Sequence, residues 1–122
     1  MCITAQWVDE GMYLAVLVTC PEGSAERIAE EVLKLRLAAC VNIIGKVRSR
    51  YWWKGRLDSA DESLLLIKTR SELFGRLEQT VKRIHPYEVP EIIGVRIERG
   101  SKDYLDWMLK ETTPTAGKMN RR

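Results

Sequence analysis

The 122-residue chain is long enough for one domain with a hydrophobic core, since 45% of its residues are apolar, and it is too short for two domains of ordinary size. Its 20 basic and 17 acidic residues leave a net charge of +3, and several basic residues lie near the C-terminal end. The rest of the chain is therefore close to neutral, which argues against a nucleic-acid partner, because phosphate binding needs a concentrated basic stripe. No run approaches the roughly 20 apolar residues of a membrane span.

The cysteines and the chain ends give expectations about compartment and domain boundaries. Cys2, Cys20 and Cys40 are an odd number without paired spacing, and no basic region followed by an apolar signal-peptide run opens the sequence. We therefore expect reduced thiols and a cytoplasmic protein. Residues 1–11 are expected to be a flexible N-terminal extension, 12–111 a single domain, and 112–122 a polar, basic and disordered tail.

The first half of the domain has the pattern of a strand, a helix and a long strand. Residues 13–19 are a short β-prone run that ends at Cys20 and Pro21. Ser24 is expected to cap a helix that reaches about residue 36, in which Ile28, Val32 and Leu35 recur at helical spacing. From residue 41 the apolar period is two, and one face of the predicted strand carries Val41, Ile43, Val47, Tyr51 and Trp53. Gly45 is expected to mark a bulge in this strand.

The second half repeats the pattern of strand, helix and strand. Residues 54–61 are polar and contain Gly55, so a hairpin connection is expected there, followed by an apolar strand over 64–67. Ser71 is expected to cap a helix that Pro86 ends. Its apolar stripe comprises Leu73, Leu77, Val81 and Ile84. A strand over 91–99 and a short helix that begins near Tyr104 complete the domain.

The resulting order, β-α-β-β-α-β, predicts a ferredoxin-like α+β fold, in which two helices cover one face of a four-stranded antiparallel sheet. Residues 13–19 and 64–67 are apolar at successive positions, so both faces of the sheet should carry apolar side chains although helices cover only one. We therefore expect the domain to associate with itself through the uncovered face. The alternative is that the last helix and the N-terminal arm cover this face within one chain.

The lone histidine opens the segment His85-Pro86-Tyr87-Glu88-Val89-Pro90-Glu91, which the two prolines should stiffen. His85, Glu88, Glu91 and Cys20 offer imidazole, carboxylate and thiolate, a donor set that suits copper or zinc better than calcium. Alternatively, His85 simply favours the C-terminus of the preceding helix, the carboxylates are solvated, and Cys20 is a small filler residue.

Other activities have weaker support. A catalytic pair of Cys20 and His85 would need a geometry that the sequence does not indicate, so we predict that the protein is not an enzyme. The aromatic and basic residues around Tyr51 and Trp53 are compatible with stacking on a single-stranded nucleic acid. Packing of this hairpin against another subunit is the favoured interpretation, because aromatic residues and arginine are common anchors at interfaces.

Several separated blocks make the sequence similar to one known family. They are Leu37-Ala38-Ala39-Cys40-Val41-Asn42, Ser49-x-Tyr51-x-Trp53-x-Gly55, Lys68-Thr69, the histidine segment extended to Ile93, and Gly100 with Tyr104-Leu105-x-Trp107. In this order and spacing, over residues 12–111, the chain resembles the CutA divalent-cation-tolerance family.

The resemblance implies a compact homotrimer of ferredoxin-like subunits, similar to the nitrogen-regulatory PII proteins, with long hairpins interlocking between subunits. It also implies a link to copper tolerance and divalent-cation binding in bacteria and to acetylcholinesterase anchoring in animals, without an established reaction. Carried over to this sequence, it makes His85 the natural metal ligand, with Tyr87, Glu88 and Glu91 near an inter-subunit cleft. The resemblance further implies that Tyr51, Trp53 and Lys68 surround this cleft.

These observations predict a non-catalytic homotrimer that binds a divalent cation, of the copper type, weakly and acts in metal response or signalling through an unidentified protein partner. A first alternative is a PII-like sensor that holds a small anionic ligand in the cleft through Lys68 and backbone donors. A second is a purely structural trimeric scaffold.

Overall fold

The computed structural model describes residues 12–114, so the expected N-terminal extension and most of the expected tail lie outside the described residues. The strands are β1 (Tyr13–Cys20), β2 (Cys40–Trp53), β3 (Arg56–Arg70) and β4 (Ile92–Ile97). The helices are α2 (Ala25–Lys34), α3 (Phe74–Ile84) and α4 (Lys102–Glu111), and the short 3-10 turns η1 (Glu22–Ser24) and η2 (Ser71–Leu73) precede α2 and α3.

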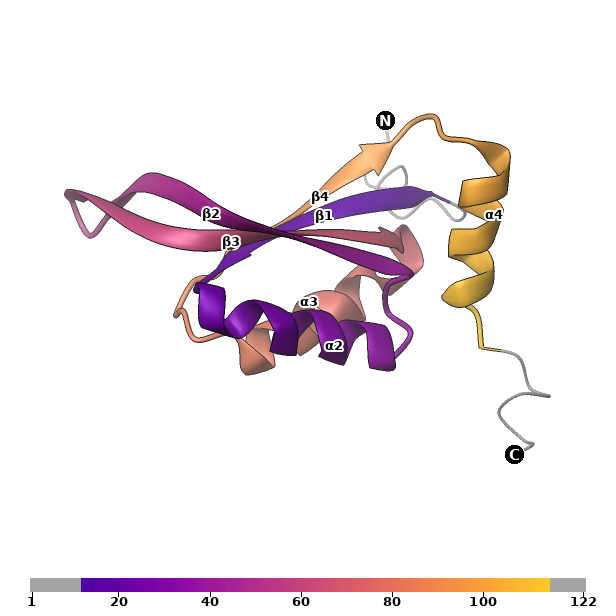
Figure 1. The fold of residues 1–122 in the computed structure, drawn as a ribbon, viewed down its shortest axis with the longest axis horizontal. Helices are drawn as coiled ribbons and strands as arrows, with labels where there is room; N and C mark the ends of the chain where they lie inside the picture. The colour runs from indigo at the N-terminus through magenta and orange to yellow at the C-terminus, as the bar shows by residue number, and fades with distance from the viewer. Residues whose placement is uncertain (1–11, 115–122) are drawn as a thin grey trace, which may run out of the picture.

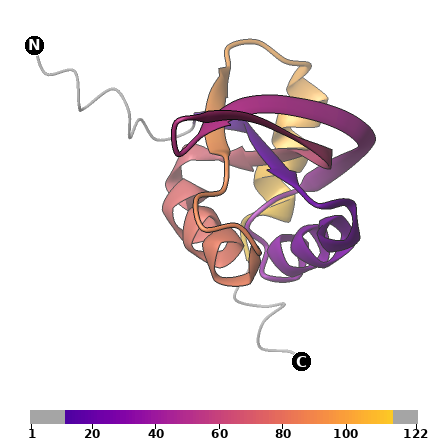
Figure 2. The same ribbon diagram turned by 90° about the vertical axis from the view of Figure 1, so that its left-hand side faces the viewer.

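The four strands form one antiparallel sheet in the order β2-β3-β1-β4. Helices α2 and α3 lie side by side on one face of this sheet, while α4 lies at one end of it (Figures 1 and 2). The predicted ferredoxin-like α+β fold is thus confirmed. The sheet face that α2 and α3 leave uncovered is called the open face below.

The hydrophobic core lies between the sheet and these two helices because the strands alternate. Every second residue of β1 is buried, and the core cluster includes Leu14, Val16, Val18 and Cys20. Ile28 and Val32 of α2 and Leu77 and Val81 of α3, which recur at helical spacing, are fully buried opposite this strand face. The predicted stripes therefore fill the core except at Leu35, which is 42% exposed because α2 ends at the residue before it.

The hairpin between β2 and β3 is longer than expected, and the predicted connection over residues 54–61 is wrong. Only Lys54 and Gly55 form the turn, with φ of 52° and 78°, as in a two-residue type I′ hairpin. β3 begins at Arg56 and runs for 15 residues. The polar residues 56–61 form a strand because they pair with residues 48–53 of β2. This part of the hairpin extends past α2 and α3, so neither of its faces has to pack on these helices and apolar side chains are not required (Figure 1).

A bulge interrupts β2 where Gly45 predicted one, but it changes the faces of the strand. Ile44 pairs with Leu64 and Val47 pairs with Glu62, so β2 holds one extra residue at this point. The insertion shifts the alternation by one position. Tyr51 and Trp53 therefore lie on the open face, opposite to Val41 and Ile43, and the predicted common face of these residues is wrong.

The helix starts also differ from prediction. The Ser24 side chain makes no capping hydrogen bond at α2, and its backbone N–H instead bonds to the Pro21 carbonyl at 2.9 Å. α3 begins at Phe74, after η2, so Ser71 is not at its N-cap position. The end of α3 is as predicted, because His85 is already extended before Pro86.

Candidate functional site

The loop of residues 85–91 is anchored to β1 by its histidine. The His85 side chain is 7% exposed, and its Nε2 lies 2.8 Å from the backbone carbonyl oxygen of Thr19. Its Nδ1 accepts a hydrogen bond from the Tyr87 N–H at 3.0 Å. These partners assign the proton to Nε2, since a carbonyl can only accept. Both ring nitrogens of His85 are thus already engaged.

A second anchor ties the same loop to β3. The Tyr87 hydroxyl donates to Oε2 of Glu62 at 2.8 Å, and the Glu62 side chain is only 4% exposed. Burial and the neighbouring Glu62 raise the pKa of the Tyr87 hydroxyl, so it remains a donor at neutral pH. Within the described residues no lysine or arginine forms an ion pair with Glu62.

Glu62 was not identified as a site residue from the sequence. Residues 54–61 were expected to be a loop, and an acidic residue next to a loop is expected to be exposed to water. One signal was available. Glu62 stands directly before the apolar run that begins at Leu64, which places it where a strand enters the folded body. A carboxylate at such a position is buried only with a partner, and the partner, Tyr87, lies 25 residues along the chain.

The carboxylates of the loop remain accessible. Glu88 and Glu91 are both exposed, and the Thr19 hydroxyl donates to Oε1 of Glu91 in a long hydrogen bond of 3.4 Å. Thr19 therefore contacts the loop twice, through its backbone with His85 and through its side chain with Glu91.

Cys20 lies in the core, at the end of β1. Its side chain is 0% exposed, and burial first, then Glu62, raises the pKa of its thiol. Within residues 12–114 no three side chains of histidine, cysteine, aspartate or glutamate are grouped so that they could hold a metal ion. The four predicted metal residues of one subunit therefore do not fit a closed metal site as they stand.

The predicted cleft residues fall in two separate places. Tyr51 lies close enough to Tyr87 for the two hydroxyls to interact electrostatically, and Trp53 lies near it on the open face of the hairpin. Lys68 is six positions beyond Glu62 on β3, roughly 20 Å away along an extended strand. Its Nζ donates to the Asn42 side-chain oxygen at 2.5 Å. One subunit does not bring Lys68 to the loop.

Large apolar side chains line the open face, and five of them are half-exposed. They are Tyr51 at 39%, Trp53 at 42%, Ile44 at 44%, Val95 at 48% and Ile93 at 49%. They lie on β2 and β4, so half-exposed apolar side chains occur at both edges of the sheet on this face. Neither α2 nor α3 covers any part of it (Figure 1).

Fold and site together define a class: a ferredoxin-like α+β domain with apolar side chains on the sheet face that α2 and α3 leave uncovered, and with an acidic loop that contains two prolines. The family model described as CutA1 divalent ion tolerance protein matches residues 14–111. The chain belongs to this family, as the sequence resemblance predicted.

Relatives agree with this assignment. A solved structure of the divalent cation tolerance protein (Cut A1) from Thermus thermophilus is 44% identical, with a TM-score of 0.82, over 84% of this chain and 100% of the other. The structure of the periplasmic divalent cation tolerance protein CutA from Archaeoglobus fulgidus is 41% identical, with a TM-score of 0.81, over 84% of this chain and 100% of the other.

The mouse relative, Protein CutA, is 45% identical over 84% of this chain, and the chain spans 58% of that relative's length. No helix among residues 12–114 is long and apolar enough to cross a membrane. Since one relative is described as periplasmic, the cytoplasmic location stays a prediction.

Proposed function

We propose that the protein works in divalent-cation tolerance as a homotrimer whose subunits bury the open face against one another. The supporting observation is the set of half-exposed apolar side chains on the open face, from Trp53 to Val95, because apolar side chains exposed on one face are typical of an interaction surface. The description of the family names divalent ion tolerance. Association of subunits would place the loop of residues 85–91 of each subunit next to a neighbouring subunit.

Sedimentation equilibrium of wild type and an Ile93→Asp variant tests the trimer. A buried, unpaired carboxylate opposes association, so Ile93→Asp should sediment as a single subunit at micromolar concentration with an unchanged far-ultraviolet circular dichroism spectrum. Leu35→Asp is the matched control, since Leu35 is 42% exposed at the end of α2, and it should remain trimeric. A wild type that is stable as one subunit would disprove the trimer.

The proposed cation site lies at the loop, with the exposed carboxylates of Glu88 and Glu91 as first ligands. His85 joins them only by giving up its hydrogen bond to Thr19, which costs about 1 kcal/mol, or roughly fivefold in affinity. This cost supports weak binding, and the imidazole and carboxylate donors support a copper-type cation. Cys20 is enclosed in the core, so it is left out of the proposed ligand set.

Titration of Cu²⁺ by calorimetry and electron paramagnetic resonance tests the ligands. His85→Gln keeps an amide donor for Thr19 but removes the imidazole, and Glu91→Gln keeps the shape but removes the charge. Each should weaken binding by about tenfold or more, whereas Glu98→Gln, an exposed carboxylate beyond β4, should not change it. Equal affinity in His85→Gln and wild type would remove His85 from the site.

We further propose that the protein acts in the cytoplasm and that its cation response is read by a partner protein that contacts the loop. A cation that displaces the His85–Thr19 hydrogen bond would change the surface of the loop, so a partner could distinguish the cation-bound protein from the cation-free protein. A pull-down with and without Cu²⁺, compared between wild type and His85→Gln, tests this. Identical partners under all four conditions would contradict it.

Lys68 supports a second candidate, a PII-like sensor of a small anionic ligand. Within the described residues its ammonium group bonds to the neutral Asn42 and lies 3.9 Å from the Cys40 sulfur, without a carboxylate partner. Its charge is therefore available to an anion. A thermal-shift screen of nucleotides, small carboxylates and metals separates the candidates, because Lys68→Gln would weaken only an anion response and His85→Gln only a metal response. If no compound shifts the melting temperature, the trimer is a structural scaffold.

A further inference from the structure

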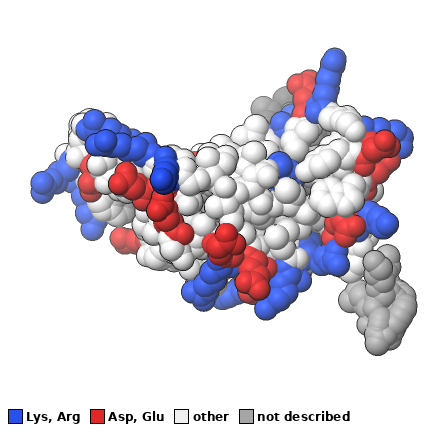
Figure 3. Space-filling view, viewed as in Figure 1, with Lys and Arg blue, Asp and Glu red and all other residues white. Residues whose placement is uncertain are grey.

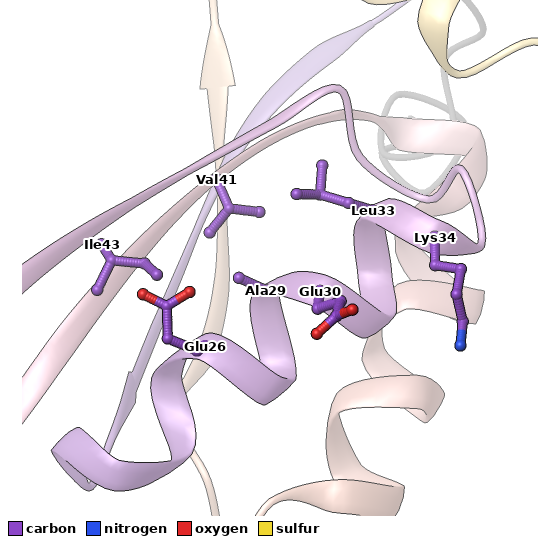
Figure 4. A pocket seen from close by; sticks show the side chains of 7 residues that line it. All are labelled: Glu26, Ala29, Glu30, Leu33, Lys34, Val41 and Ile43. Atoms are coloured by element: carbon purple, nitrogen blue, oxygen red, sulfur yellow. The ribbon is translucent and has the colours of Figure 1, made fainter.

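A groove with a volume of about 590 Å³ runs between α2 and the first half of β2. Uncharged surface lies next to acidic side chains over α2 in the space-filling view (Figure 3). Val41 and Ile43 of β2 are directed toward α2, and the carboxylates of Glu26 and Glu30 lie along the helix side (Figure 4). Leu33 lines the same groove near the end of α2. The groove therefore combines an apolar lining with two carboxylates.

The carboxylates and part of the apolar lining of this α2–β2 groove have no partner in the described part of the chain. Within residues 12–114, neither Glu26 nor Glu30 takes part in an ion pair. Leu33 and Ile43 are each 37% exposed, so apolar surface of the groove is in contact with water. A segment that suits this groove carries an apolar side chain next to cations.

The last eight residues of the sequence have this composition. Residues 115–122, which lie outside the described residues, read Thr-Ala-Gly-Lys-Met-Asn-Arg-Arg. Lys118 precedes the apolar Met119, and Arg121 and Arg122 follow it. The segment contains no acidic residue, so its charge is opposite to that of the groove.

Hydrogen bonds place the start of this segment beside one end of the groove. Arg36, which follows α2, donates to the Glu111 carboxylate at 2.8 Å and to the Glu111 carbonyl at 3.1 Å. The backbone N–H of Arg36 donates to the Leu33 carbonyl at 3.0 Å. Hydrogen bonds of 2.8 and 3.1 Å from Arg70 to Thr112 fix the chain just beyond α4. α4 thus ends on the side of the molecule where α2 also ends (Figure 1).

The segment also has the length that the groove requires. From Thr113 to Met119 an extended chain spans roughly 20 Å. The part of α2 from Leu33 back to Glu26 is about 10 Å long at the rise of a helix. The chain from Met119 to Arg122 spans about 10 Å when it is extended. Met119 can therefore reach Leu33 while Arg122 reaches Glu26.

We propose that residues 118–122 occupy the α2–β2 groove of their own chain and run antiparallel to α2. Met119 covers Leu33, the two arginine guanidinium groups face the two glutamates, and the arginine stems lie on the apolar lining. The contact lies within one chain, so it depends neither on the proposed trimer nor on the proposed cation site. The match to the family model ends at residue 111, so the contact belongs to the extension of this chain. It replaces the disorder that the sequence led us to expect for this tail.

Photo-crosslinking tests the contact in the full chain. With benzoyl-phenylalanine in place of Met119, mass spectrometry should find most cross-links on peptides that contain residues 29–34 or 41–43. Isotopically labelled and unlabelled chains, unfolded and refolded together, show whether the two cross-linked peptides come from one chain. Cross-links mainly to other regions, or mainly between labelled and unlabelled chains, would overturn the proposal.

Charge reversal with rescue tests the pairing in the same assay. Glu26→Arg/Glu30→Arg should lower the yield of the intrachain cross-link at least about fivefold, and adding Arg121→Glu/Arg122→Glu should restore it to within about twofold. Glu98→Arg, at an exposed position outside the groove, should leave the yield unchanged. On the chain without charge reversal, about 0.5 M salt should also lower the yield, because it screens exposed charges. A yield that neither charge reversal nor salt lowers would overturn the proposal.

Discussion

Replacement of Tyr87 by phenylalanine removes a single hydroxyl group and leaves the Glu62 carboxylate without its hydrogen-bond donor. The bond is 2.8 Å long, and Glu62 is 4% exposed, so water has little access to take the place of the phenol. The ring itself keeps its place, because phenylalanine has the same shape and the contact of the ring with His85, 4.9 Å between centroids, is preserved.

The cost follows from the charge and burial of the acceptor. A hydrogen bond to a charged group contributes about 1.5–3 kcal/mol, and a buried acceptor that loses its donor also bears its desolvation penalty. Since Tyr87 is half-buried rather than enclosed, we expect Tyr87→Phe to lower the free energy of unfolding by about 2 kcal/mol. In a Glu62→Leu background the same replacement should cost less than about 0.5 kcal/mol, because no acceptor remains.

Urea denaturation at pH 7 and one fixed protein concentration measures these differences, since association contributes to stability. Tyr104→Phe is the matched control. Tyr104 is 42% exposed and its hydroxyl makes no hydrogen bond within the described residues, so its removal should change stability by less than about 0.5 kcal/mol. If Tyr87→Phe behaves like Tyr104→Phe, the bond to Glu62 does not hold the loop.

Three further predictions concern the thiols and the hairpin turn. In a Cys2→Ser background, the half-buried Cys40 should react with an aromatic disulfide at least ~10-fold faster than the enclosed Cys20, and equal rates would contradict the core position of Cys20. The pKa of the Cys20 thiol is raised from 9.0, so the unfolded chain loses the thiol proton at a lower pH than the folded chain does, and the free energy of unfolding should fall as pH rises above 9. The Cys20→Ala variant should show a smaller fall. Parallel pH curves for the two proteins would refute the contribution of Cys20. Gly55→Ala, at φ 78°, should lower the free energy of unfolding by about 1 kcal/mol in urea titrations, and Gly23→Ala, which has open space and no positive φ, by much less.

The order of helices and strands could be predicted from the sequence because it depends on local patterns. Ile28 and Val32 at helical spacing predicted α2, and Pro86 predicted the end of α3, since proline removes a donor and excludes a helical residue before it. These signals act within a few residues. They therefore do not depend on what the rest of the chain contacts.

The polar half of β3 could not be predicted from the sequence, because it depends on pairing with another strand rather than on a local pattern. Residues 56–61 are a strand only because residues 48–53 lie opposite to them, and pairing across a hairpin leaves no apolar period when both faces of the ribbon lie outside the core of the subunit. The bulge at Gly45 was predicted, but its effect on Tyr51 and Trp53 depends on the number of inserted residues, which only the register shows.

The residues of the loop were identified from sequence, whereas their partners were not. His85 and Tyr87 stand out as an imidazole and a phenol on either side of Pro86, but Thr19 and Glu62, which hold them, are 66 and 25 residues distant. Nothing in a local pattern pairs positions so far apart. The prolines therefore explain only part of the fixed conformation of the loop. The hydrogen bonds of His85 to Thr19 and of Tyr87 to Glu62 also hold it in place.

These anchors set two uses of His85 in competition. The imidazole cannot donate to the Thr19 carbonyl and ligate a cation through the same Nε2, and its Nδ1 is taken by the Tyr87 N–H. A cation that recruits His85 must therefore displace the loop, and by linkage any change that loosens the loop favours the cation to the same extent. The Tyr87–Glu62 bond opposes that displacement from the other side of the loop. The weak cation binding that we propose would then follow from the stability of the loop, rather than from a lack of donors.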